Sequence, residues 1–206
     1  MIDFKSFSNK TGVLAHMVSH MINPVVSGFL AAGIFAFQLT TDPFSTFKWL
    51  GLTFAITSIP TIGYVLYLVE TGHLRDFHMP DRADRIKPLF IISCWIVIST
   101  AMLIWIQAPP IIILVLVVAT VQVILLSIIT MVWKISFHSA IIMTAAVVSI
   151  LLKSNSAWFI SGLVPLVGWS RVLLRRHTIS QVIGGYLAGM CVASLALYGI
   201  GLYLTQ

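Results

Sequence analysis

Four residues that could bind or attack a phosphate group lie close together in the second half of the chain. Arg171, Arg175, Arg176 and His177 come at the end of a strongly apolar run, where charged side chains are costly unless they have a task. An arginine presents a planar fork of N–H donors that suits phosphate oxygens. A histidine nearby can act as the nucleophile or the proton carrier. The stretch 170–181 therefore predicts a site for phosphoryl chemistry.

A second polar cluster, at 134–138, contains Ser136 and His138 and lies about 40 residues earlier, also between apolar runs. A histidine that titrates near neutrality suits the role of a general acid. No carboxylate is near either histidine in the sequence, because the last of the six acidic residues is Asp84.

The two clusters resemble signatures of the type-2 phosphatidic acid phosphatase (PAP2) superfamily. The third signature, S-R-x5-H-x3-D, is matched by Ser170, Arg171 and His177, with Gln181 in the place of the aspartate. The second, P-S-G-H, is matched by Ser136 and His138, with isoleucine and phenylalanine in the other two positions. The resemblance covers about residues 80–189 and implies a helical bundle, an active site at the membrane surface and no required metal or other cofactor.

The resemblance also implies a role for each matched residue. His177 would be the nucleophile that forms a phosphohistidine, Arg171 and Ser136 would bind the phosphate, and His138 would protonate the leaving oxygen. Gln181 could orient the ring of His177 through its amide oxygen, without the charge of an aspartate. Two alternatives are open: Asp81 or Asp84 orients the ring, or Gln181 only completes the T-x-x-Q capping box that begins at Thr178.

The first signature of the family, K-x6-R-P, has its nearest counterpart at residues 81–88. Lys87 and Pro88 can stand for R-P, but the position seven residues before Lys87 is Pro80 rather than a lysine. We predict Lys87 and Arg85 as phosphate ligands, with Arg82 as a further candidate. The alternative is a solvated loop of mixed charge beside a membrane.

The composition indicates an integral membrane protein. The 206 residues are 59% hydrophobic and 9% charged, and the mean hydropathy is +1.02, whereas a soluble domain is about a quarter charged. Aspartate-rich magnesium motifs, Gly-rich phosphate loops and zinc patterns are absent from the sequence, which argues against enzymes that depend on them. So little polar surface also argues against nucleic-acid binding.

The apolar runs predict seven membrane segments, since a bilayer core of ~30 Å needs about 20 apolar residues per helix. We therefore expect an all-α polytopic transmembrane bundle of six or seven helices in a single domain, 1–206. Its PAP2-like core would be about 80–189, with two accessory helices within 13–69, the first of them retained rather than a cleaved signal peptide. The segments are roughly 13–38, 48–69, 88–107, 110–133, 137–153, 156–174 and 179–204, of which the fifth and sixth are the shortest.

Seven crossings would bring the N-terminus, the loop at 70–87 and both histidine clusters to one membrane face. That face would hold most of the cations, a bias that favours the cytoplasmic side. The bias persists without the candidate site residues, although it becomes smaller. The cations of this face are Lys5, Lys10, Arg75, Arg82, Arg85, Lys87, Lys134, Arg171, Arg175 and Arg176, against Lys48 and Lys153 on the other.

The sequence thus favours a metal-independent phosphatase whose substrate is a lipid phosphate or diphosphate in the bilayer. Among the possible substrates we favour polyprenyl diphosphate over phosphatidic acid and phosphatidylglycerophosphate, because a small chain suits a simple head group. A phosphotransferase would use the same phosphohistidine. The alternatives are a non-catalytic lipid-phosphate binder or transporter with this fold, and an unrelated channel or carrier.

Two further patterns have structural interpretations. His16 and His20 are four residues apart and share a helix face, but without a nearby carboxylate or cysteine we do not expect them to bind a metal. Gly185 and Gly189 form a G-x-x-x-G motif, which predicts close packing of the last helix against a neighbour.

Overall fold

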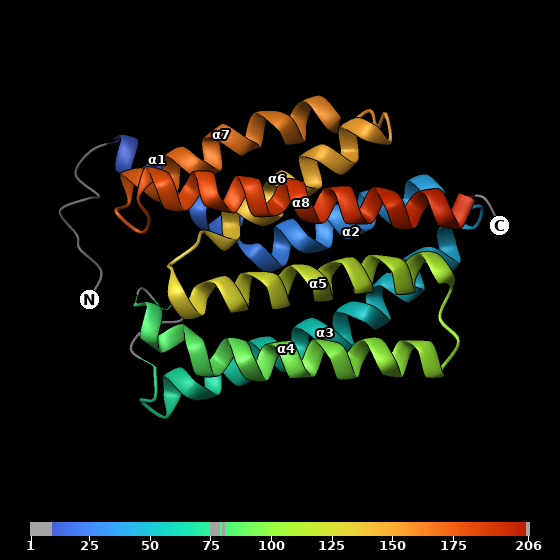
Figure 1. Cartoon of the computed structure of the whole chain (residues 1–206), viewed down its shortest axis with the longest axis horizontal. Helices are drawn as coiled ribbons and strands as arrows, with labels where there is room; N and C mark the ends of the chain where they lie inside the picture. The colour runs from blue at the N-terminus through green and yellow to red at the C-terminus, as the bar shows by residue number, and fades with distance from the viewer. Residues whose placement is uncertain (1–9, 75–78, 80, 205–206) are drawn as a thin grey trace. The chain divides into compact units, whose positions relative to one another are not determined.

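The protein is all-helical throughout the part of the chain that the computed structural model describes, residues 10–74, 79 and 81–204 (Figure 1). Lys5, Arg75 and Pro80, which enter the predictions above, lie outside these residues. The eight helices of the described chain are α1 (Lys10–Met21), α2 (Pro24–Leu39), α3 (Pro43–Glu70), α4 (Arg82–Trp105), α5 (Pro110–Val132), α6 (Phe137–Leu151), α7 (Ala157–Leu173) and α8 (Ile179–Leu204).

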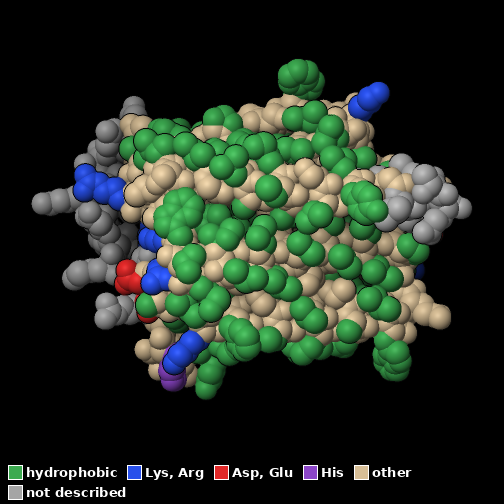
Figure 2. Space-filling view, in the orientation of Figure 1, with side chains coloured by type: hydrophobic (Ala, Val, Ile, Leu, Met, Phe, Trp, Pro, Cys, Tyr) green, Lys and Arg blue, Asp and Glu red, His purple; other side chains and the backbone are tan. Residues whose placement is uncertain are grey.

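The helices fit a multi-pass membrane protein. α3, α4, α5 and α8 are each long and apolar enough to cross a bilayer, and α1 with α2 gives a fifth candidate as a bent pair. α6 and α7, the fifth and sixth predicted segments, are apolar but shorter than α3, α4, α5 and α8, with 15 and 17 residues. The two parts of the bent pair, α1 and α2, are also short, with 12 and 16 residues. Hydrophobic side chains are spread over the face in Figure 2, as expected of a surface in contact with lipid.

The first predicted segment, 13–38, is not one helix, and the sequence prediction was wrong on this point. α1 ends at Met21, α2 begins at Pro24, and the two are bent by 55°. Pro24 disfavours a helical conformation for Asn23 and has no N–H to donate. The Asn23 side chain instead accepts a hydrogen bond from the backbone N–H of Val26 at 2.9 Å, so that it caps the new helix.

The chain divides into two compact units. Unit 1 consists of Met1–Ala31 and Ile135–Ala193, and unit 2 of Ala32–Lys134 and Ser194–Gln206. Both histidine clusters belong to unit 1, together with α1, whereas the residues that resemble the first signature belong to unit 2.

In unit 2, the side chain of Trp95 replaces a backbone hydrogen bond that a proline removes from α3. Pro60 lies inside α3 and has no N–H for the carbonyl of Ile56, its partner one turn back. The indole N–H of Trp95 from α4 donates to that carbonyl at 3.0 Å. A carbonyl without a partner is costly in an apolar environment, so Trp95 both packs α4 against α3 and satisfies the backbone at the proline.

In unit 1 the two glycines of the G-x-x-x-G motif bring α8 close to α6, which confirms the predicted close packing. A Cβ on Gly185 would lie 2.6 Å from the carbonyl oxygen of Ser136, and one on Gly189 would collide with the carbonyl of Ala140. The hydroxyl of Thr144 donates to the carbonyl of Gly189 at 3.0 Å. The start of α8 is therefore held directly against the start of α6.

Candidate active site

The connection between α7 and α8 is a helix-ending motif that fixes the spacing of the third signature. The N–H of Arg176 donates to the carbonyl of Arg171 at 3.1 Å, and that of Arg175 to the carbonyl of Val172 at 2.9 Å. These two bonds form a Schellman motif, in which the residue after the C-cap adopts the left-handed conformation. Here that residue is Arg175, with φ of 52°, where glycine is usual.

The same turn brings the backbone of His177 to Arg171. The N–H of His177 also donates to the carbonyl of Arg171, at 3.2 Å, so one carbonyl accepts two bonds. Both side chains are buried, with 3% of Arg171 and 6% of His177 exposed. The five residues between Arg171 and His177 are thus the last residues of α7 and the residues of its C-terminal cap.

Gln181 contacts the ring of His177 and completes the capping box at the same time. Its Oε1 lies 3.1 Å from Nδ1 of His177 and accepts the backbone N–H of Thr178 at 3.2 Å, while the Thr178 hydroxyl accepts the N–H of Gln181 at 3.3 Å. Gln181 thus completes the capping box and also lies within hydrogen-bond distance of His177, and its role in orienting the ring stays a prediction. Asp81 and Asp84, the alternative orienters, lie in unit 2.

This arrangement selects a tautomer of His177. Because a backbone N–H can only donate, the Gln181 atom that meets the N–H of Thr178 is the amide oxygen. The same oxygen faces Nδ1 of His177, so Nδ1 carries a proton and donates it. In the neutral imidazole the lone pair is then on Nε2.

The second cluster is the beginning of α6. Ser136 is the N-cap, and its hydroxyl accepts bonds from the N–H and the hydroxyl of Ser139. His138 is the second residue of the helix and is buried. The backbone N–H of Ser136 donates to the carbonyl of Gln181 at 3.3 Å, so the two signatures are hydrogen-bonded to each other. Ser136 itself is fully buried, and its predicted contact with phosphate stays a prediction.

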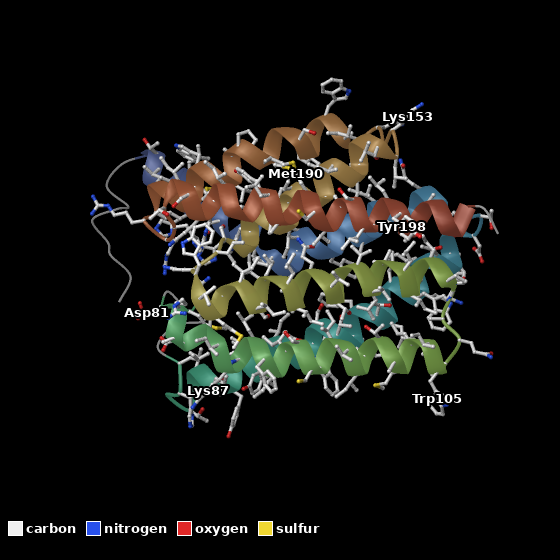
Figure 3. The ribbon with its side chains drawn as sticks, viewed as in Figure 1. Asp81, Lys87, Trp105, Lys153, Met190 and Tyr198 are labelled. Atoms are coloured by element: carbon white, nitrogen blue, oxygen red, sulfur yellow. The ribbon has the colours of Figure 1, made fainter. Side chains whose placement is uncertain are left out.

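The three predicted cations of the first cluster lie at the start of α4, in unit 2. Arg82 donates to the carbonyl of Met131 at the end of α5, and Nε of Arg85 donates to the carbonyl of Met79 at 2.7 Å. Lys87 is exposed, and Figure 3 shows it at the same end of α4 as Asp81, with Trp105 at the other end. Their role as phosphate ligands stays a prediction.

One contact of Arg171 escaped the sequence analysis. Its Nη1 donates to the hydroxyl of Ser19, on α1, at 2.5 Å. His16 and His20 lie on the same helix with their rings stacked, at a centroid distance of 6.5 Å. Positions 16, 19 and 20 share one helix face. This row of polar residues in an apolar helix is the sequence feature that could have predicted a contact between α1 and the site.

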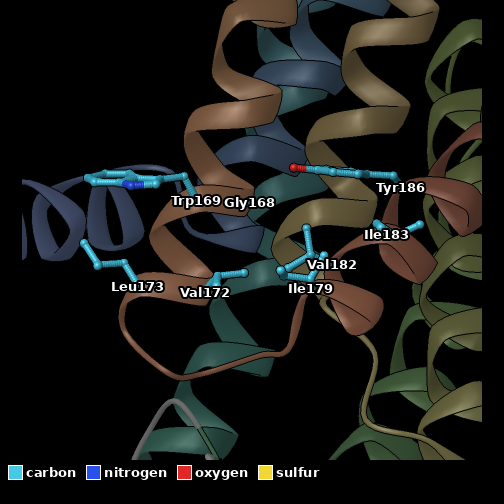
Figure 4. A pocket seen from close by; sticks show the side chains of 8 residues that line it. All are labelled: Gly168, Trp169, Val172, Leu173, Ile179, Val182, Ile183 and Tyr186. Atoms are coloured by element: carbon cyan, nitrogen blue, oxygen red, sulfur yellow. The ribbon is translucent and has the colours of Figure 1, made fainter.

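An apolar pocket of about 390 Å³ lies between α7 and α8, next to the loop that carries His177. Figure 4 shows Val172 and Ile179 beside that loop, with Tyr186 further along α8. The Tyr186 hydroxyl donates to the carbonyl of Val164 at 2.8 Å. The residues that line the pocket are Gly168, Trp169, Val172, Leu173, Ile179, Val182, Ile183 and Tyr186.

Comparison with known protein families gives a match in the second half of the chain. The sequence model of the PAP2 superfamily matches residues 127–202, from the end of α5 through most of α8. The matched segment contains His138, Arg171 and His177 but neither α1 nor the start of α4. No curated protein and no solved structure matches the chain. The segment that carries both histidine clusters, residues 127–202, is therefore similar to the PAP2 superfamily.

Proposed function

We propose that the protein is a metal-independent lipid phosphatase that acts through a phosphohistidine on His177. The observation that carries the proposal is the contact between Nδ1 of His177 and Oε1 of Gln181 at 3.1 Å. It is joined by the buried Arg171, whose backbone carbonyl accepts the N–H of His177. A ring held in this tautomer directs its Nε2 lone pair away from Gln181. A cation such as Arg171 is the group that the developing charge of a phosphoryl transfer requires.

The reaction would proceed in two displacements. In the first, Nε2 of His177 attacks phosphorus, the bond from phosphorus to the lipid oxygen breaks, and His138 gives its proton to that oxygen. In the second, water attacks the phosphohistidine, the P–N bond breaks, and His138 takes a proton from the water. Arg171 would offset the charge on the non-bridging oxygens in both steps. The bond from Ser136 to Gln181 supports a common site for the two histidines.

The pocket between α7 and α8 supports a lipid as the carrier of the phosphate. It is lined by apolar side chains and begins at Val172 and Ile179, on either side of the loop that contains His177. A hydrocarbon chain in this pocket would leave its phosphate head group at the loop, where Arg171 and His177 are. We favour a polyprenyl diphosphate as the substrate, with phosphatidic acid and phosphatidylglycerophosphate as the other candidates.

A second candidate function follows from two departures from the family signatures. Gln181 supplies the hydrogen bond of the usual aspartate without its negative charge, and Phe137 replaces the glycine before His138. Both changes would weaken catalysis more than binding. The alternative is therefore a lipid-phosphate binder or transporter that does not turn its ligand over.

The test is release of inorganic phosphate from purified protein in detergent, given polyprenyl diphosphates and glycerolipid phosphates in the presence of EDTA. His177→Ala and His138→Ala are measured beside the unmodified chain. Release that both substitutions abolish supports the two-histidine phosphatase, and the preferred lipid identifies the substrate. Binding of the same lipids without release would favour the binder or transporter.

A further inference from the structure

We propose that Ser19, on the N-terminal helix α1, is a positioning residue of the phosphate site. Its hydroxyl would fix the orientation of the Arg171 guanidinium. The inference rests on the proposed function, in which Arg171 binds the phosphate group. It adds to the site a helix that lies outside the segment matched by the family, 127–202, and that the sequence analysis treated as accessory.

The contact itself is short and buried. Nη1 of Arg171 donates to the Ser19 hydroxyl at 2.5 Å, and only 5% of Ser19 and 3% of Arg171 are exposed. Hydrogen bonds from a charged donor are short and about twice as strong as neutral ones. A guanidinium is planar and presents its five N–H groups in fixed directions. Holding one nitrogen therefore restricts the direction of all the others.

The backbones on both sides of this contact are held as well. α1 packs against α7, with Ala15 and Val18 buried on the same part of α1 as Ser19. Arg171 lies in the last turn of α7, and its carbonyl accepts the N–H of His177. Ser19 is thus connected to the proposed nucleophile through a single residue.

The partner of Ser19 is unusual for a hydroxyl in these helices. Several of the others donate back to a carbonyl one turn earlier in their own helix, as Thr57 does to Thr53 and Ser161 to Ala157. Such a bond satisfies the hydroxyl and orients nothing else. Ser19 instead accepts from a cation that is 152 residues away in the sequence, so its hydroxyl acts on a side chain of the site.

Unit 1 also provides a matched control. Ser27, on α2, is buried with 3% exposed, and its hydroxyl has no hydrogen-bond partner among the described residues. Ser27→Ala removes the same atom from the same type of environment without touching Arg171. Any general effect of removing a buried hydroxyl from the N-terminal helices will therefore appear in both variants.

The experiment measures binding of inorganic phosphate by the rise in the midpoint of thermal unfolding, which follows ligand affinity without any need for turnover. It compares the full chain with Ser19→Ala, Ser19→Thr, Ser27→Ala, Arg171→Lys and the double variant Ser19→Ala/Arg171→Lys. Hydrolysis of phosphatidic acid and of a polyprenyl diphosphate is measured on the same samples.

We expect Ser19→Ala to weaken phosphate binding by about tenfold or more, the effect of losing a hydrogen bond to a charged group. Ser19→Thr keeps the hydroxyl and should restore most of the affinity, and Ser27→Ala should leave it unchanged. With lysine at position 171 the guanidinium is absent, so Ser19→Ala should have little further effect.

The outcomes separate the inference from the function on which it rests. If Ser19→Ala binds phosphate as Ser27→Ala does, or weakens binding equally in the Arg171→Lys background, the positioning role is overturned and the phosphatase proposal is unaffected. If the unmodified chain binds phosphate but hydrolyses neither lipid, the proposed hydrolysis fails while the role of Ser19 is still decided by the binding data. Absence of both binding and hydrolysis overturns both.

Discussion

The backbone N–H of Ser136 donates to the carbonyl oxygen of Gln181 at 3.3 Å. This bond joins the start of α6 to the start of α8, and therefore the cluster of His138 to that of His177. Gly185 and Gly189 allow the approach, because any side chain there would meet the backbone of α6. The two candidate catalytic histidines are thus related by backbone contacts, which are less easily disturbed than contacts between long side chains.

The neutral side chain of Gln181 limits the proposed chemistry. Gln181→Glu keeps the length of the side chain, so it should preserve both the contact with Nδ1 of His177 and the cap on Thr178, while adding a negative charge. We expect the rate of phosphate release to rise about tenfold or more. Ser180→Glu, on an exposed neighbour, is the control for added charge. An equal rise in both variants would contradict the prediction.

Arg175 occupies a conformation that favours glycine. With φ of 52°, an L-residue is disfavoured by roughly 1–2 kcal/mol, so Arg175→Gly should stabilise the protein by about 1 kcal/mol and raise the unfolding midpoint by a few degrees. Arg175→Ala removes the same charge but keeps the unfavourable conformation. A gain in the alanine variant as large as in the glycine variant would show that charge, not backbone, is responsible.

Trp95 and Pro60 should be coupled in stability. Trp95→Phe removes the donor to the carbonyl of Ile56, and leaving that carbonyl without a partner should reduce the free energy of unfolding by about 1–3 kcal/mol. In a Pro60→Ala background the new backbone N–H can serve the same carbonyl, so the effect of Trp95→Phe should be smaller. Equal losses in the two backgrounds, measured by thermal unfolding in detergent, would disprove the coupling.

Gly185 and Gly189 of α8 should tolerate no side chain. Gly185→Ala would place a methyl group 2.6 Å from the carbonyl oxygen of Ser136, and such overpacking destabilises a protein by about 1–3 kcal/mol. Gly63 on α3 has open space around it, so Gly63→Ala should be neutral or slightly stabilising. The midpoints of thermal unfolding compare the two. A loss of stability at Gly63 equal to that at Gly185 would argue against the close packing of α6 and α8.

The pocket between α7 and α8 gives a prediction about substrate. Ile183→Trp would fill the pocket, so it should raise KM for a long-chain lipid phosphate more than for a soluble aryl phosphate. Leu187→Trp, one turn further along α8 at an exposed position outside the pocket lining, is the control. If the two variants change the ratio of the KM values to the same extent, the pocket does not hold the lipid chain.

Local patterns made most of the fold predictable. The apolar runs predicted the last four segments within about two residues of the observed helices, because bilayer thickness and short links restrict where helices end. They placed the starts of α3 and α4 five and six residues too late, because polar residues begin both helices. The capping box at Thr178 and Gln181 was also readable, since its donors and acceptors are three residues apart. The break between α1 and α2 was not predicted, although Asn23-Pro24 favours a turn. The apolar residues on both sides made the region look like one continuous membrane segment.

What the sequence could not provide was contact between distant residues. The residues around Ser19 in the sequence do not predict its contact with Arg171, because the contact forms only when α1 packs against α7. The relation of Ser136 to Gln181 likewise depends on the packing of α6 and α8. Resemblance to family signatures indicated the chemistry of the histidines and arginine, but it contained no information on a helix that carries no signature.

The short helices α6 and α7 have a consequence for the surrounding membrane. At 15 and 17 residues they span only about 22 and 25 Å along their axes, less than a hydrocarbon core of ~30 Å. Lipids beside the exposed side of α7 must compress or tilt, so the bilayer should be thinner at this helix than beside a helix long enough to cross it. Hydrophobic mismatch would thus lower the polar boundary of the bilayer toward the histidines, and a phosphate head group could reach them without its lipid leaving the membrane.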